Sequence, residues 1–218
     1  MENWSTRIFS GWGFAAEKIA ALLLTVKYLM IHSLWPTHVL EFNLAHGEWL
    51  AAAKVLLPDL AVIDSYTGVR PWATAFDLHR HTPWDRFSNS IVDITAEYLT
   101  AQGLRYQSIW MEELWVNAQM QSQNHIMHTH PNSWYSGVFY LQCPEGSQRL
   151  LFTDPRPQAS VNRLLGSAQT WAHEPRAGDL LTWPSWLQHQ TVSWTRQELA
   201  EPRISVSWNL CVEPDRTG

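Results

Sequence analysis

The chain has 218 residues, which is enough for one sizeable hydrophobic core, and a formal net charge of -5. It contains no run of lysines and arginines, so the charge pattern does not favour a nucleic-acid-binding protein. The two cysteines, Cys143 and Cys211, lack the spacing of metal ligands, and we interpret them as buried thiols of a cytoplasmic protein.

The first predicted element is an amphipathic helix within residues 14–35, where apolar side chains recur at helical spacing. Charged residues interrupt this segment, so we predict no membrane span, and no small-residue cleavage site of a signal peptide follows it. We predict an N-terminal helical extension at residues 1–32 and a single domain at residues 33–218. A further hypothesis is that the native chain starts at Met30.

Two helices are predicted next. One covers His46 to Leu57, and the other covers Pro83 to Gln102. For the second helix, Thr82 and Asp85 have the spacing of a capping box, and Gly103 is placed to end it. We expect both helices to cover one face of a sheet.

Strands dominate the second half of the chain. Segments rich in branched and aromatic residues predict strands at residues 108–119, 136–142, 148–153, 180–183 and 203–210. The last of these alternates most regularly, with Arg203, Ser205, Ser207 and Asn209 on one face and Ile204, Val206, Trp208 and Leu210 on the other. Many short strands after a helical opening predict a β-sandwich or barrel with helices packed outside.

Three histidines have the pattern of metal ligands. His128 and His130 are one residue apart, so on an extended strand both side chains point to the same face. His189 follows a predicted strand and would supply a third imidazole, a good ligand for iron, zinc or copper. His125 would point away on the same strand, so we exclude it as a ligand but allow it a place in the pocket. We interpret the other histidines as surface or core residues: His32, His38, His46, His79, His81 and His173.

Arg203 and Ser205 form a candidate site for a carboxylate. If the polar face of their strand turns into the barrel, the guanidinium offers a planar fork and the hydroxyl adds a donor. A buried guanidinium without an anionic partner is costly, which favours a bound carboxylate at this position.

Four segments in succession resemble motifs of a bacterial and phage family of Fe(II)/2-oxoglutarate-dependent oxygenases. They begin at His128 (His-Thr-His-Pro-Asn-Ser), Leu151 (Leu-Phe-Thr-Asp-Pro-Arg), Trp183 (Trp-Pro-Ser-Trp-Leu) and Arg203 (Arg-Ile-Ser-Val-Ser-Trp-Asn). The resemblance covers residues 33–212 and implies a mainly β fold with flanking helices (α+β), a double-stranded β-helix of the jelly-roll or cupin-like kind. It also implies an O2-dependent enzyme that hydroxylates an unactivated C–H bond of a small-molecule or amino-acid-like substrate.

The resemblance assigns roles by position. The implied Fe(II) ligands and catalytic residues are His128, His130 and His189, and the implied 2-oxoglutarate-binding residues are Arg203, Ser205, Asn117 and Tyr140. The expected substrate contacts are Arg156, Trp134, Trp183 and Trp208.

One departure from the resemblance keeps alternatives open. His130 stands where the superfamily usually has an aspartate or glutamate. A three-histidine dioxygenase without 2-oxoglutarate, or a zinc hydrolase, would also fit. Asp154, in its Asp-Pro-Arg setting, is expected in a turn or at the substrate instead of on the metal. A non-enzymatic β-sandwich binding module is the alternative from another class, and the choice between monomer and homodimer stays open.

Overall fold

In the computed structural model, the described residues are 36–44, 48–55, 71–157, 169–195 and 199–216. The chain divides into two units, Met1–Thr37 and His38–Gly218, and the fold below is that of the second unit. The predicted N-terminal extension at residues 1–32 lies outside the described residues. Within the described residues, no helix has the length and apolarity needed to cross a membrane.

Nine strands are described, and they form two antiparallel sheets. The larger sheet has the strand order β1-β7-β4-β9-β3-β2, and the smaller has the order β6-β5-β8. The strands are β1 (Leu40–Asn43), β2 (Trp72–Ala73), β3 (Tyr106–Gln119), β4 (Tyr135–Gln142), β5 (Arg149–Thr153), β6 (Thr170–His173), β7 (Asp179–Pro184), β8 (His189–Val192) and β9 (Arg203–Pro214). This is the predicted double-stranded β-helix.

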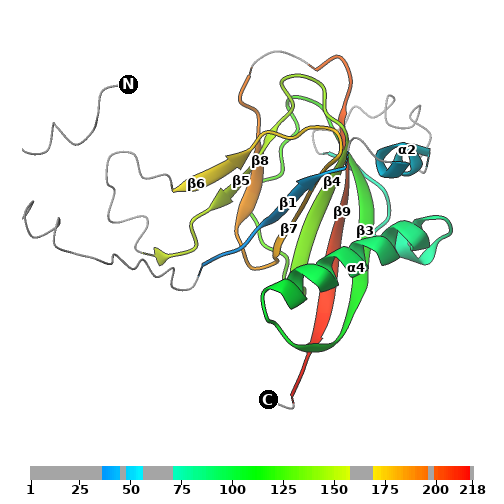
Figure 1. Cartoon of the computed structure of the whole chain (residues 1–218). Coiled ribbons are helices and arrows are strands. Elements are labelled where there is room, and N and C mark those ends of the chain that lie inside the picture. The colour runs from blue at the N-terminus through cyan, green and yellow to red at the C-terminus, as the bar shows by residue number, and fades with distance from the viewer. Residues whose placement is uncertain (1–35, 45–47, 56–70, 158–168, 196–198, 217–218) are drawn as a thin grey trace, which may run out of the picture. The chain divides into compact units, whose positions relative to one another are not determined.

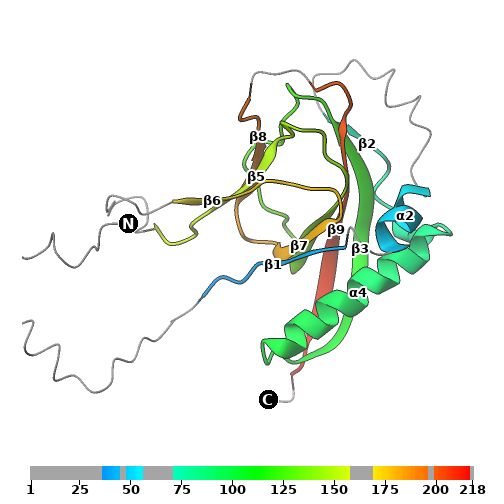
Figure 2. The same ribbon diagram turned by 45° about the horizontal axis from the view of Figure 1, so that its top comes forward.

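The described helices are α2 (Glu48–Val55), α4 (Trp84–Ala101) and the short 3-10 helix η2 (Leu78–Arg80). In both views α4 crosses the face of the larger sheet that is turned away from the smaller sheet (Figures 1 and 2). The predicted helix at residues 83–102 is therefore confirmed to within one residue at each end. The predicted helix at residues 46–57 is confirmed over Glu48–Val55.

The ends of α4 differ in how well the sequence predicted them. The capping box was wrong, because Pro83 occupies the cap position and no side chain caps the helix. The helix starts one residue later than predicted, so the carbonyl of His81 accepts the N–H of Trp84 over 2.8 Å. Gly103 ends the helix as predicted, with a φ of 74° that glycine adopts without strain.

The outer face of β9 forms the core beneath α4. Its apolar residues are fully buried, and they pack with Phe87 and Ile91 of the helix: Ile204, Val206, Trp208 and Leu210. Trp208 requires a glycine on the neighbouring strand, because a Cβ at Gly137 would lie 2.2 Å from its ring. The inner face of β9 therefore remains for its polar residues.

A second cluster fills part of the space between the two sheets. Val138 and Tyr140 of β4 pack there with Leu150 and Phe152 of β5 and with Trp183 of β7. All five side chains are buried. The rest of the space between the sheets is a cavity, and the polar face of β9 lines it.

Candidate metal centre

Three histidines converge at this cavity. His128, His130 and His189 each offer one ring nitrogen, and these nitrogens all lie within 4.8 Å of one another. His189 opens β8, and it pairs with His128 across an antiparallel bridge. The N–H of His128 donates to the carbonyl of His189 over 2.9 Å, and the N–H of His189 donates back over 3.1 Å. Backbone pairing thus brings together ligands that are 61 positions apart in the sequence.

Main-chain carbonyls fix the orientation of two of the rings. Nδ1 of His128 lies 2.7 Å from the carbonyl oxygen of Ile126, and Nδ1 of His189 lies 2.9 Å from that of Leu187. A carbonyl can only accept, so each Nδ1 carries the proton and each Nε2 keeps its lone pair. Nε2 of His189 lies 3.1 Å from Nε2 of His130, so the two nitrogens face each other.

Burial keeps the imidazoles of His130 and His189 neutral. Desolvation lowers the pKa of His189 to about 3, because its ring is buried between the sheets, and the Leu187 carbonyl opposes this only in part. Desolvation also lowers the pKa of His130 to about 4, and the neighbouring imidazoles of His128 and His125 act in the same direction. Near neutral pH both rings therefore have a free lone pair, as metal binding requires.

The donor set suits a transition metal. Three imidazole nitrogens are typical ligands of divalent iron, zinc or copper. Within the described part of the chain, no cysteine or carboxylate belongs to this group. Asp154 is engaged elsewhere, since both of its carboxylate oxygens accept hydrogen bonds from Arg156. Among the described residues Asp154 is not part of the group of converging ligand atoms.

The cavity has a volume of about 320 Å³ and joins the histidines to the inner face of β9. The polar residues of that face all line it: Arg203, Ser205, Ser207 and Asn209. The polar stripe therefore faces the cavity, which is the condition on which the carboxylate site at Arg203 and Ser205 depends. The apolar residues between them point to α4, as period-two alternation requires.

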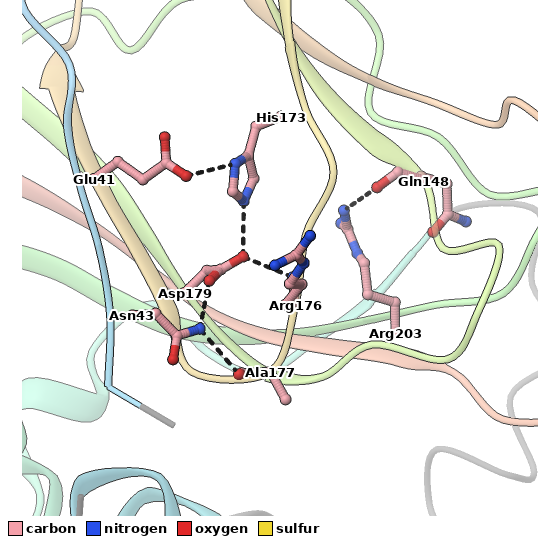
Figure 3. A network of polar contacts seen from close by, with 8 residues as sticks. All are labelled: Glu41, Asn43, Gln148, His173, Arg176, Ala177, Asp179 and Arg203. Carbon is pink, nitrogen blue, oxygen red and sulfur yellow. Dashed lines mark hydrogen bonds and ion pairs between the residues drawn. The ribbon is translucent and has the colours of Figure 1, made fainter. Parts of the chain in front are cut away.

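Arg203 is a buried cation with donors to spare. It is 3% exposed, and its Nη1 donates to the main-chain carbonyl of Gln148 over 3.3 Å (Figure 3). Its Nε has no hydrogen-bond partner, and among the described residues it forms no ion pair. Such a group is stabilised by an anion, and a guanidinium binds a carboxylate well through two parallel hydrogen bonds.

The Tyr140 ring lies next to the Arg203 guanidinium, and a polar network around His173 adjoins that ring. The guanidinium carbon of Arg203 lies 5.4 Å from the centre of the Tyr140 ring, and that ring stacks on His173 at 5.9 Å. His173 lies between Glu41 and Asp179, at 3.2 and 3.1 Å from their carboxylates (Figure 3). Burial raises the pKa of Tyr140, so its phenol stays protonated. His173 is buried, and so it is a core residue and not a surface residue, which were the two interpretations that the sequence allowed.

Asn117 and Ser205 lie opposite each other on paired strands, and both line the cavity. Asn117 is held on two sides, because its Oδ1 accepts from Nε1 of Trp115 over 3.1 Å and its Nδ2 donates to Oγ of Ser207 over 3.0 Å. Ser205 is 2% exposed. Both predicted pocket residues are therefore buried in the cavity wall.

The predicted substrate residues fall into two groups. Trp183 lines the cavity, and its ring lies 4.9 Å from that of His189. Trp208 does not, because it lies on the outer face of β9 beneath α4. Trp134 is 52% exposed and also lies outside the cavity. Arg156 is exposed and lines a separate surface pocket with Asp154. The expectation that Trp134 and Trp208 wall the pocket is therefore corrected, and Arg156, expected to contact the substrate, lies outside this cavity.

Two cavity residues were missed by sequence reasoning. Glu113 and Trp115 line the cavity from β3, on the same face as Asn117. The spacing of two between these residues was a usable signal, because Asn117 was already a candidate. His125 also lines the cavity without joining the metal group, and its ring centre lies 6.2 Å from that of His128.

Residues 113–209 match the family described as "Putative 2OG-Fe(II) oxygenase". This segment of the chain is similar to the 2OG-Fe(II) oxygenase family. The matched segment contains all three histidines and Arg203, so the match and the site coincide. A search of curated proteins found no match.

Several solved structures have a similar fold. HygX from Streptomyces hygroscopicus, with nickel and 2-oxoglutarate bound, has a TM-score of 0.54 at 14% identity over 83% of this chain and 84% of HygX. A Pseudomonas putida prolyl-4-hydroxylase has a TM-score of 0.52 at 12% identity, over 82% of this chain and 94% of the hydroxylase. The epimerase SnoN from nogalamycin biosynthesis has a TM-score of 0.57 at 13% identity, over 84% of this chain and 83% of SnoN. At these identities the likeness establishes the fold alone, a double-stranded β-helix.

Proposed function

We propose that this oxygenase binds Fe(II) through His128, His130 and His189 and uses 2-oxoglutarate and O2 to hydroxylate an unactivated C–H bond. The proposed substrate is a small molecule or resembles an amino acid. The observation that carries the proposal is a single cavity that contains both the three converging imidazoles and the unpaired guanidinium of Arg203. A metal and a carboxylate can therefore bind side by side.

The residues fit both groups. Three imidazole nitrogens suit Fe(II), and HygX has been crystallised with iron and with nickel plus 2-oxoglutarate. Iron with bound 2-oxoglutarate supplies the oxidising power for C–H hydroxylation when it reacts with O2, and 2-oxoglutarate leaves as succinate and carbon dioxide. The remaining chemistry is a matter of positioning by the protein.

The chain's own residues bind and orient the reactants. Arg203 holds the far carboxylate of 2-oxoglutarate in its fork, and the hydroxyl of Ser205 adds a donor from the next inward position of β9. Trp183 and Phe152 pack against His189, with ring centres 4.9 and 5.9 Å away. These rings hold the imidazole in place and exclude water from that side of the site.

The unpaired Arg203 separates this proposal from its closest rival. A three-histidine dioxygenase without 2-oxoglutarate, or a zinc hydrolase, does not require a buried guanidinium in the same cavity as the ligands. The replacement of the usual carboxylate by His130 is compatible with either chemistry, and the buried guanidinium of Arg203 supports the proposal of 2-oxoglutarate as co-substrate.

We also propose that the protein acts in the cytoplasm, since Cys143 and Cys211 are both free thiols. The homodimer remains a prediction, as does the expectation that the protein binds no nucleic acid.

The test is succinate formation from 2-oxoglutarate under air, with and without Fe(II), across a library of small molecules. We expect a slow background rate that depends on Fe(II) and rises when a substrate is present. The His189→Ala variant serves as the control without a complete ligand set. Equal succinate release by the wild type and by His189→Ala would contradict the proposal.

A further inference from the structure

Glu113 stands apart from the other residues that line the cavity. Among the described lining residues it is the one carboxylate, and neither the metal group nor the 2-oxoglutarate site uses it. It is half-buried, and it forms no ion pair with any residue in the described ranges. An acidic group in such a place lacks the counter-charge that stabilises it.

The paired strands β3 and β9 place Glu113 far from Arg203. Glu113 pairs with Asn209, and six positions further along β3, Gln119 pairs with Arg203. At about 3.4 Å per residue the two charged residues are separated by about 20 Å along the strands. The cavity thus has a cationic end for a dicarboxylic acid and an acidic end at the opposite side.

Hydrogen bonds hold the Glu113 carboxylate on one side only. Nδ2 of Asn209 donates to Oε2 of Glu113 over 2.6 Å. The amide cannot turn freely, because its Oδ1 accepts from Oγ of Ser136 over 2.8 Å, and that hydroxyl is 2.7 Å from Oγ of Ser185. No hydrogen bond to Oε1 of Glu113 is found from the described residues, so this oxygen can accept one from a ligand.

Aromatic rings lie beside the carboxylate. Trp115 follows Glu113 on the same face of β3, and its ring centre lies 6.3 Å from that of His130. The ring centres of Phe76 and Trp115 lie 4.8 Å apart. Phe76 lines the cavity and is 49% exposed. A carboxylate next to aromatic faces is a combination that binds organic cations. The pair also connects the acidic end of the cavity to a metal ligand.

We propose that Glu113 binds a protonated amine of the substrate and so sets the substrate class of this oxygenase as amine-bearing. This inference rests on the proposed function, since it assigns the acidic end of that same cavity to the substrate. The ammonium donates to Oε1 of Glu113 and lies against Phe76 and Trp115, while 2-oxoglutarate occupies the Arg203 end. The amine can belong to a free small molecule or to a lysine side chain, and both present the same ammonium group.

The test compares three small aromatic ligands whose polar group is cationic, neutral or anionic. Benzylamine, benzyl alcohol and benzoate are titrated by calorimetry into protein loaded with Ni(II) and 2-oxoglutarate, and into protein without either. The variant Glu113→Gln removes the charge and keeps an acceptor for Asn209. The matched control is Glu112→Gln, because Glu112 is the preceding residue of β3, is exposed, and accepts a hydrogen bond from Nε1 of Trp110 outside the cavity. A tripeptide with a central lysine, and its norleucine counterpart, form a second arm.

We expect the wild type to bind benzylamine at least about tenfold more tightly than benzyl alcohol, with benzoate weakest. Glu113→Gln should abolish this preference, and Glu112→Gln should retain it. Tighter binding of the lysine tripeptide than of benzylamine would place the amine on a peptide. Equal binding of benzylamine and benzyl alcohol, no binding of any amine, or a preference that survives in Glu113→Gln would overturn the inference.

The two loading states separate this inference from the proposed function. Intact Ni(II) and 2-oxoglutarate binding without an amine preference overturns the role of Glu113 alone. An amine preference in protein that binds neither Ni(II) nor 2-oxoglutarate overturns the proposed function alone.

Discussion

The Nε2 atoms of His130 and His189 lie 3.1 Å apart, and their rings are nearly parallel. Both imidazoles have lowered pKa values, so neither carries a second proton near neutral pH. Nδ1 of His189 already donates to the carbonyl of Leu187, which leaves a lone pair directed at His130. Two such nitrogens are stabilised by a shared cation, and the nearby ring of His128 completes the set for a metal ion.

The identity of residue 130 gives the first prediction. His130→Ala removes one of three ligands, and we expect it to weaken Fe(II) binding by more than about 100-fold, beyond the loss typical of an outer-shell partner. His130→Asp restores the two-histidine, one-carboxylate set that this superfamily usually has, so it should still bind the metal. Binding is measured by anaerobic titration with Fe(II). The control is His125→Ala, which should bind Fe(II) like the wild type, and loss of metal in that variant would count against the assigned ligands.

The second prediction concerns Arg203. Replacing it with methionine removes the fork that we assign to 2-oxoglutarate, and we expect the Kd for 2-oxoglutarate to rise about 10- to 100-fold, as for the loss of hydrogen bonds to a charged group. The free energy of unfolding should also depend on whether 2-oxoglutarate is present. Without ligand, Arg203→Met should be as stable as the wild type or more so, because an unpaired buried charge is removed.

With 2-oxoglutarate at about 100 times its Kd, the wild type should gain about 2.7 kcal/mol of unfolding free energy, and the variant should gain far less. Calorimetry and thermal unfolding check both parts. Arg149→Met is the matched control, since Arg149 pairs with Glu174 outside the cavity. Unchanged 2-oxoglutarate affinity in Arg203→Met would exclude the assigned role.

Strand periodicity explains why so much of the site could be predicted from the sequence. In β9 the alternation of polar and apolar residues is unbroken from Arg203 to Leu210, so both faces followed directly from it. The pair His128 and His130 needed only an extended backbone to share a face. The motif order then pointed to His189 as the third ligand.

The remainder depended on contacts that the sequence does not encode locally. The strands β6 and β8 have four residues each, too few for a periodic pattern, so neither was predicted. Trp208 was expected at the pocket because of its neighbours in sequence, whereas alternation sends it to the outer face. Glu113 was missed because a register shift between Met111 and Glu113 interrupts the pattern of β3.

The third prediction is a pH dependence of the metal-free protein. The folded-state pKa values of His130 and His189, about 4 and about 3, lie below the ordinary value of 6.5. Below pH 6.5 the unfolded chain therefore binds protons that the folded chain refuses, and stability falls as the pH falls from about 6.5 towards 4. Each histidine contributes a slope of at most about 1.4 kcal/mol per pH unit.

Urea unfolding at a series of pH values measures this slope. Replacing His189 with asparagine removes one of the groups, so the slope of that variant should be shallower between pH 6.5 and 4. His81→Asn is the control, because His81 is exposed and lies outside the cavity. A slope that His189→Asn leaves unchanged would show that the imidazole is not held neutral by burial.

The fourth prediction tests the packing that turns the polar face of β9 inward. Gly137→Ala places a Cβ against the Trp208 ring and 2.6 Å from the carbonyl oxygen of Leu181. We expect a loss of about 1–3 kcal/mol or more of unfolding free energy, since the core has no room to expand. Trp208→Leu in the same chain should offset only part of the loss, because the Leu181 clash remains. Chemical denaturation of both variants checks this, and full stability in Gly137→Ala would contradict the tight contact.

The most direct test of the central claim is an anaerobic visible spectrum of the protein with Fe(II) and 2-oxoglutarate. If the three imidazoles hold iron next to Arg203, the mixture should develop a weak charge-transfer absorption that appears only when both additions are present. The absorption should be lost in His189→Ala and should require more 2-oxoglutarate in Arg203→Met. A wild-type spectrum that 2-oxoglutarate does not change, in protein shown to contain Fe(II), would contradict the account.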